Sequence, residues 1–110
     1  MKLLICGTRG AKLSYEDFVK EIPGLTYSEI IEGCCPDSPD MYAERYAKEK
    51  GIPIKHYPAN SGNYLKRNIE MVEEADAVLA FWNKYSYGTA HAIANAVMRN
   101  KKVWIVEVKK

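Results

Sequence analysis

The chain has 110 residues, the size of one domain, of which 47% are hydrophobic and 27% are charged, as in ordinary globular proteins. Its formal net charge of +2 argues against a nucleic-acid or acidic-membrane partner. No apolar run is long enough to cross a membrane, and the one after Met1 is too short for a signal peptide, so we expect a cytoplasmic protein.

Short apolar runs alternate with segments of helical spacing along the whole chain. The apolar runs predict five strands, at residues 2–6, 26–32, 52–57, 76–82 and 102–108. Helical spacing and capping signals predict four helices, at residues 14–22, 40–50, 63–74 and 89–100. The alternation and the short links predict a single α/β domain with a three-layer, Rossmann-like, doubly wound parallel sheet. The right-handed crossover rule favours the strand order 3-2-1-4-5, with the second strand less buried than the others.

Two predicted strand ends carry residues suited to an anion. The first strand is followed by Gly7-Thr8-Arg9-Gly10, in which glycine permits close approach and the guanidinium can grip a phosphate with two bonds. The fourth strand is followed by Ser86-Tyr87-Gly88-Thr89 and then by an Ala-rich helix, whose start favours an anion. Thr89 is a candidate helix cap with a spare hydroxyl. Ordinary turns with a surface arginine and a capped helix are the alternative interpretation.

The cysteines and histidines give no clear chemical pattern. An odd count, with Cys34 and Cys35 adjacent and Cys6 far away, does not indicate a disulfide framework, and adjacent cysteines make a poor zinc pair. A catalytic cysteine needs a base, and the sequence does not show that His56 or His91 lies near one. Plain buried thiols are therefore expected, and neither a metal site nor a cofactor is indicated.

Several short motifs together resemble the YspA/YpsA-related family of the SLOG superfamily. C-G-T-R after the first strand is similar to that family's G-S-R turn, and I-I-E-G-C-C-P-D-S-P-D-x-x-A-x-x-Y-A resembles its G-G-x-x-G-x-D-x-x-A-x-x-W/Y-A segment. Arg67-Asn68 with Met71 resembles its R-N-x-x-M helix, and A-D-A-V-L-A-F with G-T-x-H-x-I-x-x-A resembles its last strand and phosphate loop. The order and spacing of the motifs cover nearly the whole chain.

The resemblance implies a Rossmann-like fold and kinship with the "Lonely guy" phosphoribohydrolases and with DprA. It also implies a nucleotide or nucleotide-derived ligand. The implied ligand contacts are Gly7, Thr8, Arg9, Gly33, Asp40, Arg67, Asn68, Gly88, Thr89 and His91. Two positions depart from the family: Cys34 replaces the second glycine of the G-G pair, and Ala92 replaces the glutamate of the phosphoribohydrolases.

These departures bear on whether the protein is an enzyme. Cleavage of an N-glycosidic bond builds positive charge on the ribose, which a nearby carboxylate stabilises. With Ala92 in place of glutamate, Asp40 is the substitute candidate and Asp37 a poorer one. For His91, contact with a phosphate or base ranks before packing, and packing before acid–base catalysis. The basic pair at Lys66 and Arg67 is either near the ligand or simply solvated.

Three hypotheses follow. The first is a nucleotide-binding module that acts as a sensor or carrier, the second a nucleotide N-glycosidase or phosphoribohydrolase, and the third a DNA-processing or structural assembly protein.

Three aromatic residues, Trp82, Tyr85 and Tyr87, precede the predicted helix at 89–100 and are suited either to stacking on a base or to a subunit interface. The aromatic content of so small a domain also predicts a homodimer or higher homo-oligomer. Asp76, at the opposite edge, is expected to cap its strand or to pair with a backbone N–H.

Overall fold

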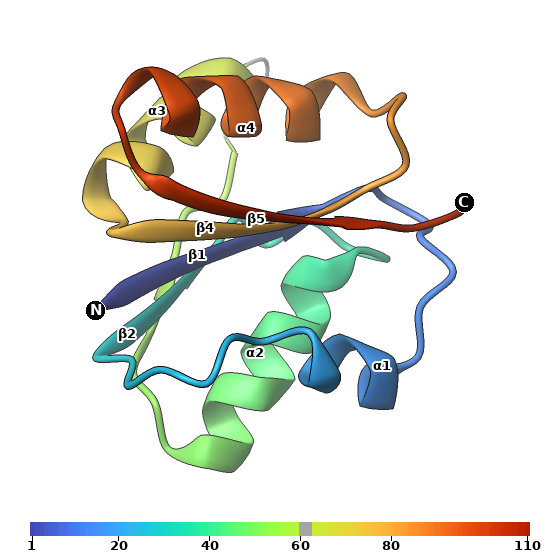
Figure 1. Ribbon diagram of the computed structural model, residues 1–110, viewed down its shortest axis with the longest axis vertical. Coiled ribbons are helices and arrows are strands. Elements are labelled where there is room, and N and C mark those ends of the chain that lie inside the picture. The colour runs from blue at the N-terminus through green and yellow to red at the C-terminus, as the bar shows by residue number, and fades with distance from the viewer. Residues whose placement is uncertain (60–62) are drawn as a thin grey trace.

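The computed structural model describes residues 1–59 and 63–110 and has the predicted α/β architecture (Figure 1). Five parallel strands form one sheet in the order β3-β2-β1-β4-β5, as in Rossmann-like folds. The strands are β1 (Lys2–Gly7), β2 (Glu29–Glu32), β3 (Ile54–His56), β4 (Ala77–Trp82) and β5 (Lys102–Glu107). The helices are α1 (Tyr15–Lys20), α2 (Pro39–Lys50), α3 (Tyr64–Glu74) and α4 (Tyr87–Met98). The predicted fold class and strand order are confirmed.

Helices cover both faces of the sheet, so two cores flank it. Figure 1 shows α1 and α2 on one face and α3 and α4 on the other. The first core packs Phe18 and Ala43 of α1 and α2 against Leu3 and Phe81 of the sheet. The second core packs helices α3 and α4 against the opposite side of β1, β2 and β4. Since β1 and β4 are covered on both faces, their side chains are apolar without alternation.

Local capping signals place most helix ends. Ser14 caps α1, and its hydroxyl accepts a hydrogen bond from the Asp17 N–H at 3.1 Å. Ser38 caps α2, which has a proline at its first position and ends at Gly51, where φ is 67°. Asp76, just before β4, accepts a hydrogen bond from the Lys2 N–H of β1 at 2.7 Å, so the predicted pairing with a backbone N–H is confirmed.

Two predictions about the sheet are wrong in detail. Strand β2 is shorter than predicted, and Ile30, Ile31 and Glu32 are fully buried, although we expected this strand to be less buried. Helices on both faces bury it, whereas the edge strands β3 and β5 are the more exposed ones. The segment P-A-N-S-G at residues 58–62 indicates a turn, and residues 60–62 of it lie outside the described residues. The one isolated antiparallel bridge seen among the described residues joins Lys12 to Lys109, outside the parallel strands.

Two predictions about the helices also need correction. Helix α4 begins at Tyr87, and its cap is Ser86 instead of Thr89, which lies inside the first turn. The helical spacing of Leu65, Ile69 and Val72 predicts that all three face inward. Leu65 is instead 42% exposed, because the buried face of α3 is formed by Asn68, Met71 and Val72. Within the described ranges, no helix has both the length and the apolar character needed to cross a membrane.

Candidate functional site

A cleft of about 430 Å³ opens at the carboxyl edge of the sheet, where β1 and β4 lie side by side. The strand order reverses at this point: β2 and β3 lie on one side of β1, and β4 and β5 lie on its other side. Such a switch point is where open parallel sheets bind ligands, and the volume falls in the range of small-molecule sites. The lining residues are Cys6, Gly7, Arg9, Cys35, Asp40, Tyr64, Leu65, Arg67, Asn68, Met71, Ser86, Tyr87, Gly88, Thr89 and Ala92.

Arg9 and the start of α4 meet at this cleft, as the sequence predicts. Arg9 is exposed, and its Nη2 lies 3.3 Å from the Cys35 sulfur, so the guanidinium has most of its donors left for a ligand. The Ser86 hydroxyl is directed to the Thr89 N–H, and the N–H groups of Tyr87 and Gly88 have no acceptor within the helix. A cation and free helix N–H groups therefore face the same space.

The two loops that carry these groups are held together by Thr8 and Asn83. The Thr8 hydroxyl accepts from the Asn83 N–H at 3.1 Å and donates to the Asn83 side-chain oxygen at 3.3 Å. The same oxygen accepts from the N–H groups of Tyr85 and Ser86, both at 2.9 Å. Thr8 is 2% exposed and does not line the cleft. It therefore fixes the geometry of the loops, a role that the sequence analysis did not assign to it.

Asp40 is a buried carboxyl group in the wall of the cleft. It lies in the first turn of α2, is 5% exposed, and accepts a hydrogen bond from the Cys35 N–H at 3.1 Å. Burial raises the pKa of Asp40 to about 7, against the opposing effects of that N–H and of the Arg67 charge. Asp40 is therefore able to exchange a proton near neutral pH. Asp37, the poorer catalytic candidate, is exposed and is not among the lining residues.

Arg67 and Asn68 line the cleft, and most of their polar groups form hydrogen bonds within the protein. Arg67 donates from Nη1 to the carbonyl oxygens of Gly33 at 2.7 Å and Tyr57 at 3.3 Å. Asn68 is 5% exposed and donates to the Gly88 carbonyl at 3.1 Å. These bonds tie α3 to the ends of β2 and β3 and to the first turn of α4. The basic group of Arg67 is thus not merely solvated, while its Nη2 group takes part in none of these bonds and the residue lines the cleft.

The three predicted glycines, Gly7, Gly33 and Gly88, differ in what lies where a side chain would be. A Cβ atom at Gly7 would lie 2.5 Å from the Pro39 side chain, and one at Gly33 would lie 2.5 Å from the Arg67 guanidinium. Both glycines therefore make room for neighbouring protein atoms. At Gly88 a Cβ would meet nothing within 4 Å. Gly88 is thus the glycine whose missing side chain leaves open space at the cleft.

His91 lies outside the group that lines the cleft. It is in the second turn of α4, and its Nε2 lies 3.2 Å from the amide nitrogen of Asn95. Its Nδ1 is buried without a hydrogen-bond partner among the described residues. Packing within the helix, the second-ranked interpretation, accounts best for this placement.

Two residues at the mouth of the cleft were not predicted from the sequence. Tyr64 and Leu65, in the first turn of α3, are 55% and 42% exposed. Tyr87, considered as a stacking residue, faces them from the start of α4, whereas Trp82 is held by a 3.0 Å bond from its indole N–H to the Ser86 carbonyl. The missed signal was available, since the start of α3 follows β3 at the same sheet edge.

Of the ten implied contacts, the structure brings most to one cleft. Those that line it are Gly7, Arg9, Asp40, Arg67, Asn68, Gly88 and Thr89. Thr8, Gly33 and His91 do not.

Potential metal ligands gather elsewhere: Glu32, Cys34 and His56 each bring one ligand atom to within 4.8 Å of the other two. The expectation of plain buried thiols holds for Cys6 and is wrong for Cys34 and Cys35, which are half-buried.

No family model, no curated protein and no solved structure matches this chain. The functional assignment therefore depends on the residues of the cleft.

Proposed function

We propose that this protein binds a nucleotide or a nucleotide-derived anion in the cleft at the carboxyl edge of the sheet, as a sensor or carrier. The observation that supports this most directly is that Arg9 and the first turn of α4 line the same cleft of about 430 Å³. A guanidinium and a helix N-terminus are both suited to phosphate, and their combination at a switch point is typical of nucleotide sites. The resemblance to the SLOG superfamily supports the same proposal.

The rest of the ligand has a place in the same cleft. Tyr64 and Tyr87 stand at the starts of α3 and α4 with exposed rings, which suit stacking on a purine or pyrimidine. Met71 and Ala92 give the floor an apolar character. The proposed arrangement puts the phosphate against Arg9 and the α4 N-terminus and the base between the two tyrosines.

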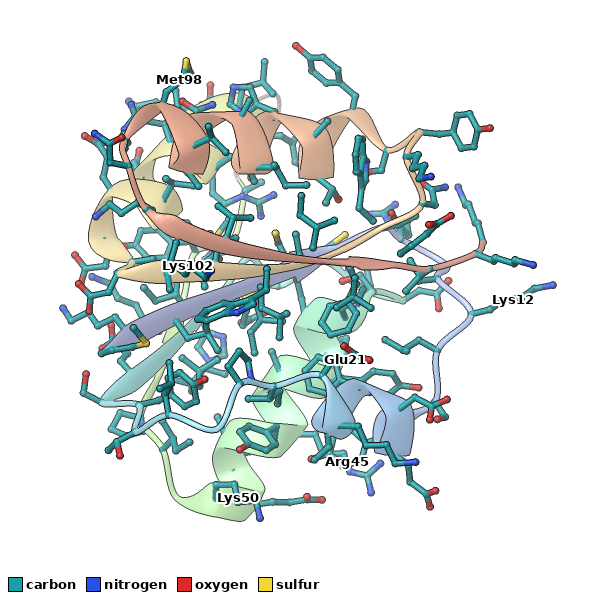
Figure 2. All side chains as sticks on the ribbon, viewed as in Figure 1. Lys12, Glu21, Arg45, Lys50, Met98 and Lys102 are labelled. Atoms are coloured by element: carbon teal, nitrogen blue, oxygen red, sulfur yellow. The ribbon has the colours of Figure 1, made fainter. Side chains whose placement is uncertain are left out.

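Calorimetric titration with mononucleotides, cyclic nucleotides and ADP-ribose tests this proposal. We expect Arg9→Ala to weaken binding roughly 30-fold or more, because it removes a charge-assisted contact, and to leave folding unchanged. Arg45→Ala is the matched control: it removes the same charge from the outer side of α2, on the other face of the sheet (Figure 2). Equal affinity of wild type and Arg9→Ala would contradict the role of Arg9. Failure of the wild type to bind any nucleotide would favour an assembly or DNA-processing role.

The second candidate function is hydrolysis of an N-glycosidic bond, and Asp40 favours it. A buried carboxyl group with its pKa raised to about 7, in the wall of a cleft, is typical of acid–base and nucleophilic residues. In this reaction the C1′–N bond breaks, the base leaves with a proton, and a water oxygen bonds to C1′ while a carboxylate stabilises the positive ribose. Slow release of free base by the wild type, lost in Asp40→Ala, would establish this activity. Ala92, where the phosphoribohydrolases have glutamate, argues against it.

We also propose that the protein forms a homodimer through the outer side of α4. This helix has no charged residue along its whole length, yet Val97 and Met98 are 60% and 70% exposed, and Met98 points away from the sheet in Figure 2. Two copies of an uncharged face can meet about a two-fold axis without like-charge repulsion. Light scattering is expected to give a dimer mass for the wild type and a monomer mass for Val97→Lys. A wild-type monomer at tens of micromolar would contradict it.

A further inference from the structure

Glu32, Cys34 and His56 form a compact cluster at the ends of β2 and β3, next to the cleft but outside its lining. Glu32 and His56 are register partners in the two parallel strands, and Cys34 follows two residues after β2. The Cys34 sulfur lies 3.2 Å from Glu32 Oε1 and 3.4 Å from His56 Nδ1, and Nδ1 also contacts Oε1. A thiol, an imidazole and a carboxylate thus converge on one point.

The carboxylate of Glu32 is oriented for this convergence. Its side chain is fully buried, and its second oxygen, Oε2, accepts a 2.6 Å hydrogen bond from the Cys34 N–H. The backbone therefore holds one carboxylate oxygen and turns the other toward the sulfur and the imidazole. Such outer hydrogen bonds commonly orient metal ligands. The His56 side chain remains 42% exposed, which leaves the cluster accessible from solvent.

Cys34 stands where the backbone favours glycine. Its φ of 59° is in the left-handed region, which is costly for a residue with a side chain. Residues that break a local backbone rule tend to occur at functional sites. The thiol is a poor nucleophile here, because burial and the hydrogen bond to Glu32 raise the pKa of Cys34 to about 12. A metal ion displaces a thiol proton even so, since its charge replaces that proton.

Two of the three distances between these atoms are close to those on one face of a tetrahedral zinc site. Zinc bonds of about 2.0 Å to nitrogen or oxygen and about 2.3 Å to sulfur place neighbouring ligand atoms roughly 3.3–3.7 Å apart at tetrahedral angles. The 3.4 Å sulfur–nitrogen distance lies in this range, and the 3.2 Å sulfur–oxygen distance lies just below it. The contact between Nδ1 and Oε1 is shorter than the range, so the nitrogen and oxygen ligands have to move apart around an ion.

We propose that Glu32, Cys34 and His56 bind a divalent cation of the zinc type. Cys34 Sγ, His56 Nδ1 and Glu32 Oε1 are the three protein ligands, and the Cys34 proton passes to solvent on binding. A set of sulfur, nitrogen and oxygen donors suits zinc better than magnesium or calcium, which require oxygen ligands. The fourth position is open to water or to an added ligand, as in zinc sites with three protein ligands. None of the three ligands lines the proposed nucleotide cleft.

Zinc chloride itself is the probe, titrated calorimetrically into the full chain under a non-chelating reductant. We expect one zinc ion per chain and a higher melting temperature. Cys34→Gly and His56→Gln are each expected to weaken zinc binding about 100-fold or more. Glycine adopts the backbone at position 34 without strain, and residue 56 is exposed, so both variants are expected to fold, which circular dichroism checks.

Cys35→Ser is the matched control, because it removes the adjacent thiol, whose sulfur contacts Arg9 instead of the cluster. It is expected to leave zinc affinity within about twofold of the wild type. With cobalt(II) as a spectroscopic substitute, a thiolate-to-cobalt charge-transfer band is expected in the wild type and in Cys35→Ser but not in Cys34→Gly. The proposal is overturned if the wild type binds no zinc, if the two cysteine variants weaken binding equally, or if the band persists in Cys34→Gly.

Discussion

The cleft beside β1 and the cluster beside β2 share one edge of the sheet but differ in chemistry. At the cleft, a guanidinium and helix N–H groups offer donors that suit an anion. At the cluster, a carboxylate, a thiol and an imidazole offer lone pairs that suit a cation. Since every parallel strand delivers its following residues to the same edge, the fold supplies the positions. The residue types that follow each strand then decide what each position can bind.

Arg67 forms the wall between these two regions. Its side chain lines the cleft, while its Nη1 donates to Gly33, which directly precedes Cys34, and to Tyr57, which directly follows His56. Gly33 lets the guanidinium approach this closely, because any Cβ there would clash with it. The charge of Arg67 therefore stabilises the backbone beside the cluster while shaping the neighbouring cleft.

The largest expected effect comes from Arg67→Ala, which tests whether the two regions share this wall. The substitution leaves two carbonyl oxygens without their donor and removes a charge near Asp40. We expect the free energy of unfolding to fall by about 4 kcal/mol, and both nucleotide and zinc affinity to fall with it. Chemical denaturation measures the stability. Lys66→Ala, on the adjacent exposed residue of α3, is the control and is expected to change stability by less than about 0.5 kcal/mol. Loss of only one affinity in Arg67→Ala would show that the regions are separate.

The next prediction is that folding stability depends on pH through Asp40, in the wall of the cleft. The pKa of Asp40 is about 7 in the folded chain, and an unfolded aspartate has a pKa of about 3.9. Between these values the folded chain holds a proton that the unfolded chain has lost, so stability falls as pH rises from about 4 to about 7 and is level above that. The difference of roughly 3 pKa units corresponds to a decline of about 4 kcal/mol over this range, which is expected to be absent in Asp40→Asn. Denaturation curves at several pH values check this, and parallel curves for the two proteins would contradict it.

The smallest expected effect comes from Gly88→Ala, which tests whether this glycine is needed for ligand binding or for backbone conformation. Gly88 lies in the first turn of α4 with open space where a Cβ would be, so Gly88→Ala is expected to raise the free energy of unfolding by about 0.5–1 kcal/mol. The new methyl group narrows the cleft, and nucleotide affinity is expected to fall about tenfold. Gly51→Ala is the contrasting control: at φ 67° it is expected to lower stability by about 1 kcal/mol without affecting binding. A Gly88→Ala protein with unchanged affinity would place the ligand elsewhere.

The sequence predicted the parts of the site that depend on strand ends. The apolar runs of β1 and β4 marked them as central, and the crossover rule made them neighbours. Because parallel strands end at the same edge, Arg9 and Gly88 had to lie close together, and they line one cleft. Capping was less certain, since Ser86 and Thr89 are both good cap residues, and only the packing of α4 on β4 places its first turn at Tyr87.

Other features depend on tertiary structure alone. Periodicity and caps act over a few neighbouring residues, so the sequence determined the elements, the fold class and the order of the strands. The pairing of Glu32 with His56 joins residues 24 positions apart and follows from the register of β2 on β3, which no local pattern encodes. The same holds for the burial of β2 and for the contact of Arg67 with Gly33, because each depends on which surfaces meet when the layers pack. The cysteines looked inert in the sequence because His56, which contacts Cys34, and Arg9, which contacts Cys35, come from distant parts of the chain.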